Sequence, residues 1–145
     1  MVKLFDVLKS EHQEVKELLN QIQETGDEEG NLFEEVRRKL ELHMNGEEKY
    51  FYPEMGDYEE LKELIIEAYE EHEAAQSVLR KLRWITFTDI GFKARIKVLK
   101  DLIEHHIEEE ENEIFPAIEQ IVSEDQLEKI EQDYMEYQNK KLGLR

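Results

Sequence analysis

The stretch HMNGEEKYFYP at residues 43–53 is matched by HIEEEENEIFP at residues 106–116. In each copy a histidine is followed four residues later by a glutamate and ten residues later by a proline. These residues are His43, Glu47 and Pro53 in the first copy and His106, Glu110 and Pro116 in the second. Repetition at this scale indicates two related halves. Because histidine and glutamate bind metals, the repeat predicts two half-sites that close on one metal centre.

Each half also carries an upstream histidine within a helical pattern. His12 lies 31 residues before His43, and His72 lies 34 residues before His106. Counting residues from the predicted turns places all four histidines within about one helical turn of the same cross-section. Each histidine falls on the apolar stripe of its helix, and each glutamate follows its histidine by one turn on the same face. The spacing therefore predicts that the six side chains converge.

Apolar residues recur at helical spacing along most of the chain. They predict helices over roughly 2–24, 29–52, 58–85 and 91–121, and a last helix from the capping box at Ser123 to about 140. Breaks are expected at 25–30, 53–56 and 86–91, with a kink at Pro116. Trp84 is interpreted as a core residue at a helix end. The pattern predicts an all-α fold, an up-down-up-down four-helix bundle with a short C-terminal helix, forming one domain over 1–145.

Composition limits the possible partners. The 19 basic and 37 acidic residues give a formal charge of -18, which argues against binding to nucleic acid or to an anionic membrane surface. No apolar run approaches the ~20 residues of a membrane span, and no signal-peptide pattern opens the chain, so a cytoplasmic location is expected. The absence of cysteine excludes thiolate zinc sites and iron–sulfur clusters.

Four imidazoles and two carboxylates in one core layer would be costly to bury without partners. A metal ion compensates their charge and polarity, and a set without thiolates suits iron, manganese or zinc better than copper(I). The two glutamates could each bridge two metals held ~3.5–4 Å apart. The predicted ligands are His12, His43, Glu47, His72, His106 and Glu110. The alternative is an acidic bundle whose histidines form only hydrogen bonds.

These residues resemble the hemerythrin-like family, also called the HHE cation-binding domain. The resemblance covers nearly the whole chain. It rests on Glu11-His12, on His43 to Glu47 with Tyr52-Pro53, on Glu71-His72, and on His106 to Glu110 with Phe115-Pro116. It implies a non-haem di-iron centre of two iron ions with a bridging oxo or hydroxo group. It also implies that the centre binds dioxygen or a related small ligand such as peroxide or nitric oxide. It does not indicate a protein partner.

One position departs from the family pattern. Hemerythrins usually carry a second histidine one turn after the third-helix histidine, and here that position is Gln76. Counting about twelve ligand positions for two octahedral irons leaves about two open positions instead of one. The open site favours peroxide chemistry, sensing or labile iron over oxygen carriage. Gln76 and Tyr69 are the neighbouring residues that could occupy the ligand position of the absent histidine.

Other residues near the motifs receive simpler interpretations. His105 and Glu109 form a second HxxxE, but the apolar stripe favours His106 and Glu110, so His105 is assigned to the surface or to a supporting position. Glu48 and Glu111 are expected to be solvated. The apolar residues expected to line the site are Leu8, Val15, Leu40, Leu79, Leu99 and Ile103.

Four functions remain open from the sequence. The first is a di-iron module that binds or senses dioxygen. The second is a di-iron peroxidase or nitric oxide-handling enzyme. The third is an iron-responsive or storage-like protein, and the fourth is a structural zinc or empty bundle. The order His-x-x-x-Glu favours the hemerythrin type over ferritin-like bundles, which use Glu-x-x-His spacing.

Overall fold

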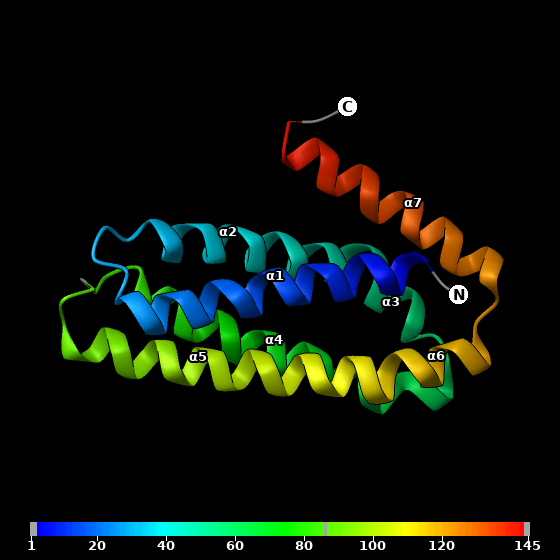
Figure 1. The fold of residues 1–145 in the computed structure, drawn as a ribbon. Coiled ribbons are helices and arrows are strands. Elements are labelled where there is room, and N and C mark those ends of the chain that lie inside the picture. The colour runs from blue at the N-terminus through cyan, green and yellow to red at the C-terminus, as the bar shows by residue number, and fades with distance from the viewer. Residues whose placement is uncertain (1–2, 86, 144–145) are drawn as a thin grey trace.

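The computed structural model describes residues 3–85 and 87–143, and every element in these ranges is helical (Figure 1). The long helices are α1 (Lys3–Thr25), α2 (Asn31–Gly46), α4 (Lys62–Leu82), α5 (Ile90–Glu109) and α7 (Glu124–Lys141). The shorter elements are the π-turns η1 (Glu47–Phe51) and η3 (Glu110–Ile114), the 3₁₀ turn η2 (Glu59–Leu61), and the helices α3 (Tyr52–Met55) and α6 (Phe115–Ile121). An all-α helical bundle is thereby confirmed. The predicted helix start at residue 2 and the break at Thr86 lie outside the described residues.

The helices pack in sequential pairs. Helix α1 packs against α2, α4 packs against α5, and α1 also packs against α5, which joins the two halves. Figure 1 shows these four helices side by side, with α7 inclined across one side of the bundle. The α1–α2 and α4–α5 turns lie together at one end, and α3 and α6 lie at the other end. The repeated motifs begin on α2 and α5, and each of these helices packs against the helix that carries the upstream histidine of its half, α1 or α4.

Local signals explain where the helices start. Gly30 adopts φ +75°, a left-handed conformation that favours glycine, directly before α2. The Asp27 carboxylate accepts a hydrogen bond of 2.8 Å from the Phe33 N–H, which compensates for an unpaired donor in the first turn. The Ser123 hydroxyl accepts from the Gln126 N–H at 3.2 Å and caps α7, as the capping box predicts.

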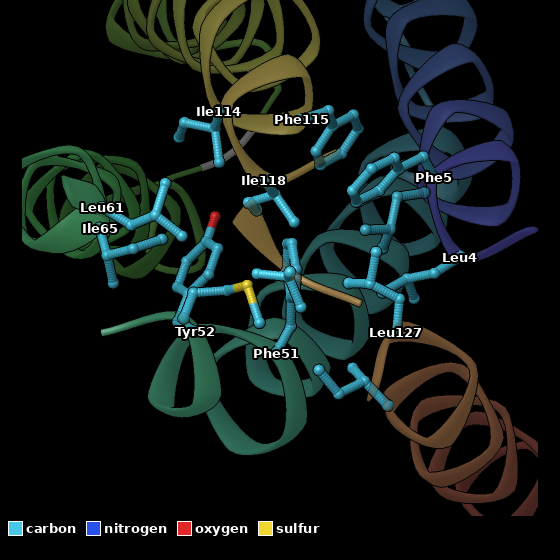
Figure 2. Packing of buried hydrophobic residues seen from close by; sticks show 14 of the residues in the cluster. Leu4, Phe5, Phe51, Tyr52, Leu61, Ile65, Ile114, Phe115, Ile118 and Leu127 are labelled. Atoms are coloured by element: carbon cyan, nitrogen blue, oxygen red, sulfur yellow. The ribbon is translucent and has the colours of Figure 1, made fainter. Parts of the chain in front are cut away.

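The buried apolar residues form two clusters. The first apolar cluster surrounds α3 and α6 (Figure 2) and consists of Leu4, Phe5, Leu8, Phe51, Tyr52, Met55, Leu61, Ile65, Ala68, Ile114, Phe115, Ile118, Val122, Leu127, Ile130 and Tyr134. The second apolar cluster consists of Val15, Leu18, Leu19, Ile22, Phe33, Val36, Leu40, Met44, Ala75, Leu79, Leu82, Phe92, Ile96, Leu99, Ile103 and Ile107. In α1 and α4 the buried histidine lies between residues of the two clusters. In α2 and α5 it lies near the helix end among residues of the second cluster, and residues of the first cluster follow in η1 and η3.

The helix predicted to end at residue 52 continues past Pro53, and the helix predicted over 91–121 continues past Pro116. A π-turn precedes each proline, and the helix then continues to Met55 in the first half and to Ile121 in the second. In the first half the Tyr52 N–H bonds to the Glu47 carbonyl, five residues back, instead of to a residue four back. Pro53 and Pro116 then fall in the first turn of α3 and α6, where a missing N–H costs little.

Trp84 is not a core residue, contrary to the prediction. Its side chain is 87% exposed, whereas Leu82 is buried. Helix α4 ends at Leu82, so Trp84 lies in the following turn and no longer follows the helical face that points inward.

Within the described ranges, no helix combines the length and the hydropathy that crossing a lipid bilayer requires.

Gly46 is required by the close approach of α7 to α2. A Cβ atom at this position would lie 2.6 Å from Tyr134 Cε2 and 2.9 Å from Gln138 Nε2. We expect Gly46→Ala to destabilise the protein by ~1–3 kcal/mol, because overpacking must displace α7. Urea unfolding followed by circular dichroism measures this change. Gly56→Ala is the matched control, since its Cβ would meet only backbone at 3.6 Å, and an equal loss in both variants would contradict the explanation.

Candidate metal centre

Four donor side chains converge on one side of the layer between the two apolar clusters. His12, His43, Glu47 and Glu110 are all buried, and one donor atom from each lies within 4.8 Å of the others. His12 Nε2 lies 3.1 Å from Glu110 Oε1, and His43 Nε2 lies 3.2 Å from Glu47 Oε1. We call this group subsite A. It combines histidines from α1 and α2 with a glutamate from each half of the chain.

A second group of donors lies beside it and shares one glutamate. Glu47 Oε1 is 3.2 Å from His72 Nε2 as well as from His43 Nε2. His72 Nε2 lies 3.2 Å from His106 Nε2, and His106 Nε2 lies 3.4 Å from Glu110 Oε2. We call this group, with His72, His106 and Glu47, subsite B. The structure thus brings all six predicted site residues together and places both glutamates between the two subsites.

Several donor atoms in this layer lack a hydrogen-bond partner. They are His12 Nε2, His43 Nε2, Glu47 Oε2 and Glu110 Oε1, and all four are fully buried. Buried polar atoms are nearly always paired, and leaving a carboxylate oxygen unpaired in the core is costly. The four atoms all belong to subsite A. A cation would satisfy them together, so the donor set fits a metal ion.

Four outer carboxylates hold the imidazole rings. Each accepts a 2.7 Å contact from the Nδ1 atom of one histidine: Glu11 with His43, Glu48 with His72, Glu71 with His106, and Glu111 with His12. An Nδ1–H donated to a carboxylate leaves Nε2 free to bind a metal and fixes the ring orientation. Each outer carboxylate is the chain neighbour of a predicted ligand. Glu48 and Glu111, which are expected from the sequence to be solvated, are 31% and 29% exposed but each also pairs with an imidazole.

The outer carboxylates should strengthen metal binding. We expect Glu48→Gln to weaken metal affinity ~10–100-fold, because the amide no longer stabilises the Nδ1–H of His72. A competition titration with a coloured chelator measures the change. Glu70→Gln removes a neighbouring exposed carboxylate and should leave the affinity as it is. Equal affinities in wild type and Glu48→Gln would show that the His72 contact does not support binding.

The buried charges shift the titration of the donors in the metal-free protein. Burial opposes protonation of His106, but the charge of Glu110 and a hydrogen bond with it raise the pKa of His106 to about 10. Burial likewise opposes protonation of His43 and His12. The charge of Glu47 nevertheless raises the pKa of His43 well above the usual value, and the adjacent carboxylates of Glu110 and Glu111 raise the pKa of His12. Burial would raise the pKa of Glu110, but His106 lowers it well below the usual range. The metal-free layer is therefore held by the attraction between imidazolium and carboxylate groups, although the four atoms named above make no hydrogen bond.

Tyr52 also reaches this layer, and the sequence did not predict it as a site residue. Its hydroxyl lies 3.3 Å from both His72 Nε2 and His106 Nε2, and its one proton faces two acceptors, Glu47 Oε1 at 3.1 Å and Glu110 Oε2. Burial and the two carboxylates raise the pKa of its phenol well above the usual value. The sequence contains one sign of this role: the residue directly before the repeated proline is Tyr52 in the first copy and Phe115 in the second.

The remaining candidates lie outside the donor layer. His105 is 70% exposed and contacts Glu71 and Glu109 on the surface, in agreement with the predicted register. Gln76 is half-buried, and its chain neighbour Ala75, rather than Gln76 itself, lines the cavity beside the imidazoles. Tyr69 packs edge-on against the Tyr52 ring at 5.3 Å and so supports Tyr52.

A small apolar cavity adjoins the imidazoles on the side of the second apolar cluster. It has room for about one water-sized molecule. Val15, Leu40 and Ile103 line it, as predicted, whereas Leu8, Leu79 and Leu99 are buried in the core without lining it. Met44 and Ala75 add to the apolar wall. The four donor histidines with Glu11 and Glu71 complete the lining, so a molecule of about the size of water has space directly beside the donor layer.

Comparisons with known proteins identify the family of the chain. The sequence model described as the hemerythrin HHE cation binding domain matches residues 3–118, which include all six converging donors. A "DNA nickase" from Nostoc sp. (strain PCC 7120 / SAG 25.82 / UTEX 2576) is 28% identical over 131 residues. That match covers 85% of this chain but 35% of the relative, so the chain spans about a third of it. No solved structure matches at a comparable level. The chain belongs to the hemerythrin HHE cation-binding domain family.

Proposed function

We propose that this protein binds two iron ions, one in each subsite, and through them binds or senses dioxygen. The observation that carries the proposal is the sharing of Glu47 between His43 and His72, with the same oxygen 3.2 Å from both Nε2 atoms. Two adjacent donor groups joined by carboxylates suit a pair of cations. Imidazole and carboxylate ligands without thiolate suit iron. Two irons, when bound, supply the electrons that dioxygen binding requires.

The side chains support this function by holding and shielding the centre. The outer carboxylates keep a proton on each Nδ1 atom, so that the Nε2 atoms face the metals. The apolar cavity gives a small molecule a place beside them. Both ligand glutamates are fully buried, which restricts the centre to small ligands.

The same reasoning extends to the whole chain. We infer an up-down-up-down four-helix bundle with α7 packed on it, forming one domain over residues 1–145. Its support is the pairwise packing of α1 with α2 and of α4 with α5, together with the contacts that α7 makes with both α1 and α2. Tyr134 of α7 donates a hydrogen bond to Glu11, which in turn contacts His43. Helix α7 therefore supports the centre although it lies beyond the matched residues.

The name of the nickase relative does not carry over to this site. A nickase must bring a DNA phosphate to its reacting groups, whereas the donor layer here is buried and the chain has a formal charge of -18. The acidic surface repels the DNA backbone, and the buried centre excludes it by size. We therefore expect no nucleic-acid partner.

Metal analysis followed by optical spectroscopy tests the proposal. Protein prepared with ferrous iron under anaerobic conditions should hold two irons per chain. Admitting oxygen should produce a visible band that disappears when oxygen is removed. His106→Ala should lose the iron of subsite B and with it the band, whereas the neighbouring control His105→Ala should keep both irons and the band. Irreversible oxidation would favour the peroxidase or iron-responsive function, and protein that retains zinc or no metal would contradict the proposal.

A further inference from the structure

We propose that Tyr52 is a seventh protein ligand, which binds the iron of subsite B through its phenol oxygen. The inference rests on the proposed di-iron function and adds a ligand to it. The hydroxyl contacts four donors at once, namely both Nε2 atoms of subsite B and one oxygen from each ligand glutamate. The Tyr52 side chain is fully buried, so these contacts have no competition from solvent.

The separations among these atoms match those of ligands around one metal ion. In an octahedral site with bonds of about 2.1 Å, neighbouring donor atoms lie about 3 Å apart. Here the Tyr52 oxygen is 3.3 Å from His72 Nε2 and 3.3 Å from His106 Nε2, and the two nitrogens are 3.2 Å apart. The Glu47 oxygen lies 3.1 Å from the Tyr52 oxygen and 3.2 Å from His72 Nε2. These four donors are spaced as adjacent corners of one coordination polyhedron.

The repeat shows that the phenol is specific to one subsite. Tyr52 and Phe115 occupy equivalent positions, each directly before the repeated proline and after a π-turn. Their rings also sit alike, since the Tyr52 ring lies 5.2 Å from the His72 ring and the Phe115 ring lies 6.3 Å from the His12 ring. Figure 2 shows both rings within the first apolar cluster. Phenylalanine therefore satisfies the packing, and the hydroxyl of Tyr52 serves another purpose.

The phenol also compensates for the missing histidine. The family's usual fifth histidine would stand at position 76, which here is Gln76 next to the second apolar cluster. Tyr52 approaches the donor layer from the first apolar cluster instead. Adding Tyr52 raises the number of protein ligands to seven and leaves about one open coordination position on the two irons, as in a five-histidine site. A bound cation reverses the local electrostatics that keep the phenol protonated in the metal-free protein.

Resonance Raman spectroscopy of the ferric di-iron protein tests the assignment. A phenolate bound to ferric iron should give a visible charge-transfer band whose excitation enhances tyrosine ring vibrations, and ring-deuterated tyrosine should shift them. Tyr52→Phe should abolish these signals and weaken iron binding in subsite B by more than about 100-fold, because a direct ligand contributes more than a supporting residue. Tyr137→Phe is the matched control, because Tyr137 is a buried tyrosine whose ring packs against Tyr50, and it should keep the signals.

The outcomes separate this inference from the proposed function. Two irons with tyrosine vibrations that are lost only in Tyr52→Phe would support the inference. Two irons without such vibrations in the wild type would overturn it and leave the di-iron function standing, with Tyr52 as a hydrogen-bond donor. Protein that binds no iron would overturn both. Because Phe115 occupies the equivalent position, Tyr52→Phe should fold, and its circular dichroism spectrum verifies this.

Discussion

Glu47→Gln should remove metal from both subsites at once. One oxygen of Glu47 lies 3.2 Å from a histidine Nε2 atom in each subsite, so its loss takes a ligand from both. Glutamine has nearly the same shape but no negative charge, and the fully buried position offers no water as a substitute. We expect the metal content to fall from two ions per chain to below about a tenth of that value, because a direct ligand contributes more than the 10–100-fold of a supporting residue.

Comparison with a histidine variant makes this result specific. His43→Ala removes a ligand from subsite A alone, so about one ion per chain should remain in subsite B. His105→Ala should retain two ions, because His105 lies on the surface. Mass-spectrometric metal analysis after gel filtration gives the three values. If Glu47→Gln retained one full ion per chain, Glu47 would not bridge the subsites.

The metal-free protein should lose stability as the pH rises from 6.5 to 10. The pKa of His106 is raised from 6.5 to about 10, and those of His43 and His12 are raised as well. Raised values mean that the imidazolium–carboxylate pairs contribute fully below pH 6.5 and that this contribution is lost as the pH rises through the folded values. We expect the melting temperature to fall by ~10 °C over this range, because the loss of the imidazolium–carboxylate pairs removes several kcal/mol from the free energy of unfolding.

Acid should destabilise the metal-free protein through a different group. The pKa of Glu110 is lowered well below 4.5, so its contribution to stability is present above pH 4.5 and is lost as the pH falls through the folded value.

Bound metal should reverse the loss of stability on the alkaline side, because bound histidines must be neutral and protons compete with the metal. Thermal melts of the metal-free and zinc-loaded forms at pH 5.5, 7.5 and 9.5 measure this. The stabilisation by zinc should grow with pH, and a metal-free melting temperature that is unchanged from pH 6.5 to 10 would contradict the pairing.

The sequence predicted the donor layer because its ligands follow regular helical spacing. His12, His43, His72 and His106 fall at one depth, and the apolar stripe selected His106 over His105. These conclusions need only the length and period of a helix.

The supporting residues could not be predicted from helical periodicity. Glu48 and Glu111 follow inward residues by one position, about 100° around the helix, which indicates the flank of the helix. There they reach an imidazole on a neighbouring helix, which a single helical wheel does not represent. Tyr52 follows Glu47 by five residues, which in an α-helix turns it about 140° away. The π-turn η1 brings it back, and its Tyr52-to-Glu47 backbone bond spans five residues.

The separation of the core into two apolar clusters has a consequence for folding cooperativity. Helices α1, α2, α4 and α5 supply the buried histidines, and between the clusters these helices contribute a polar layer. In the metal-free protein this layer offers charged pairs instead of continuous apolar packing, so the two ends of the bundle are two potential foldons with weak coupling. Bound ions join all four helices at one level and should turn the two foldons into one cooperative unit.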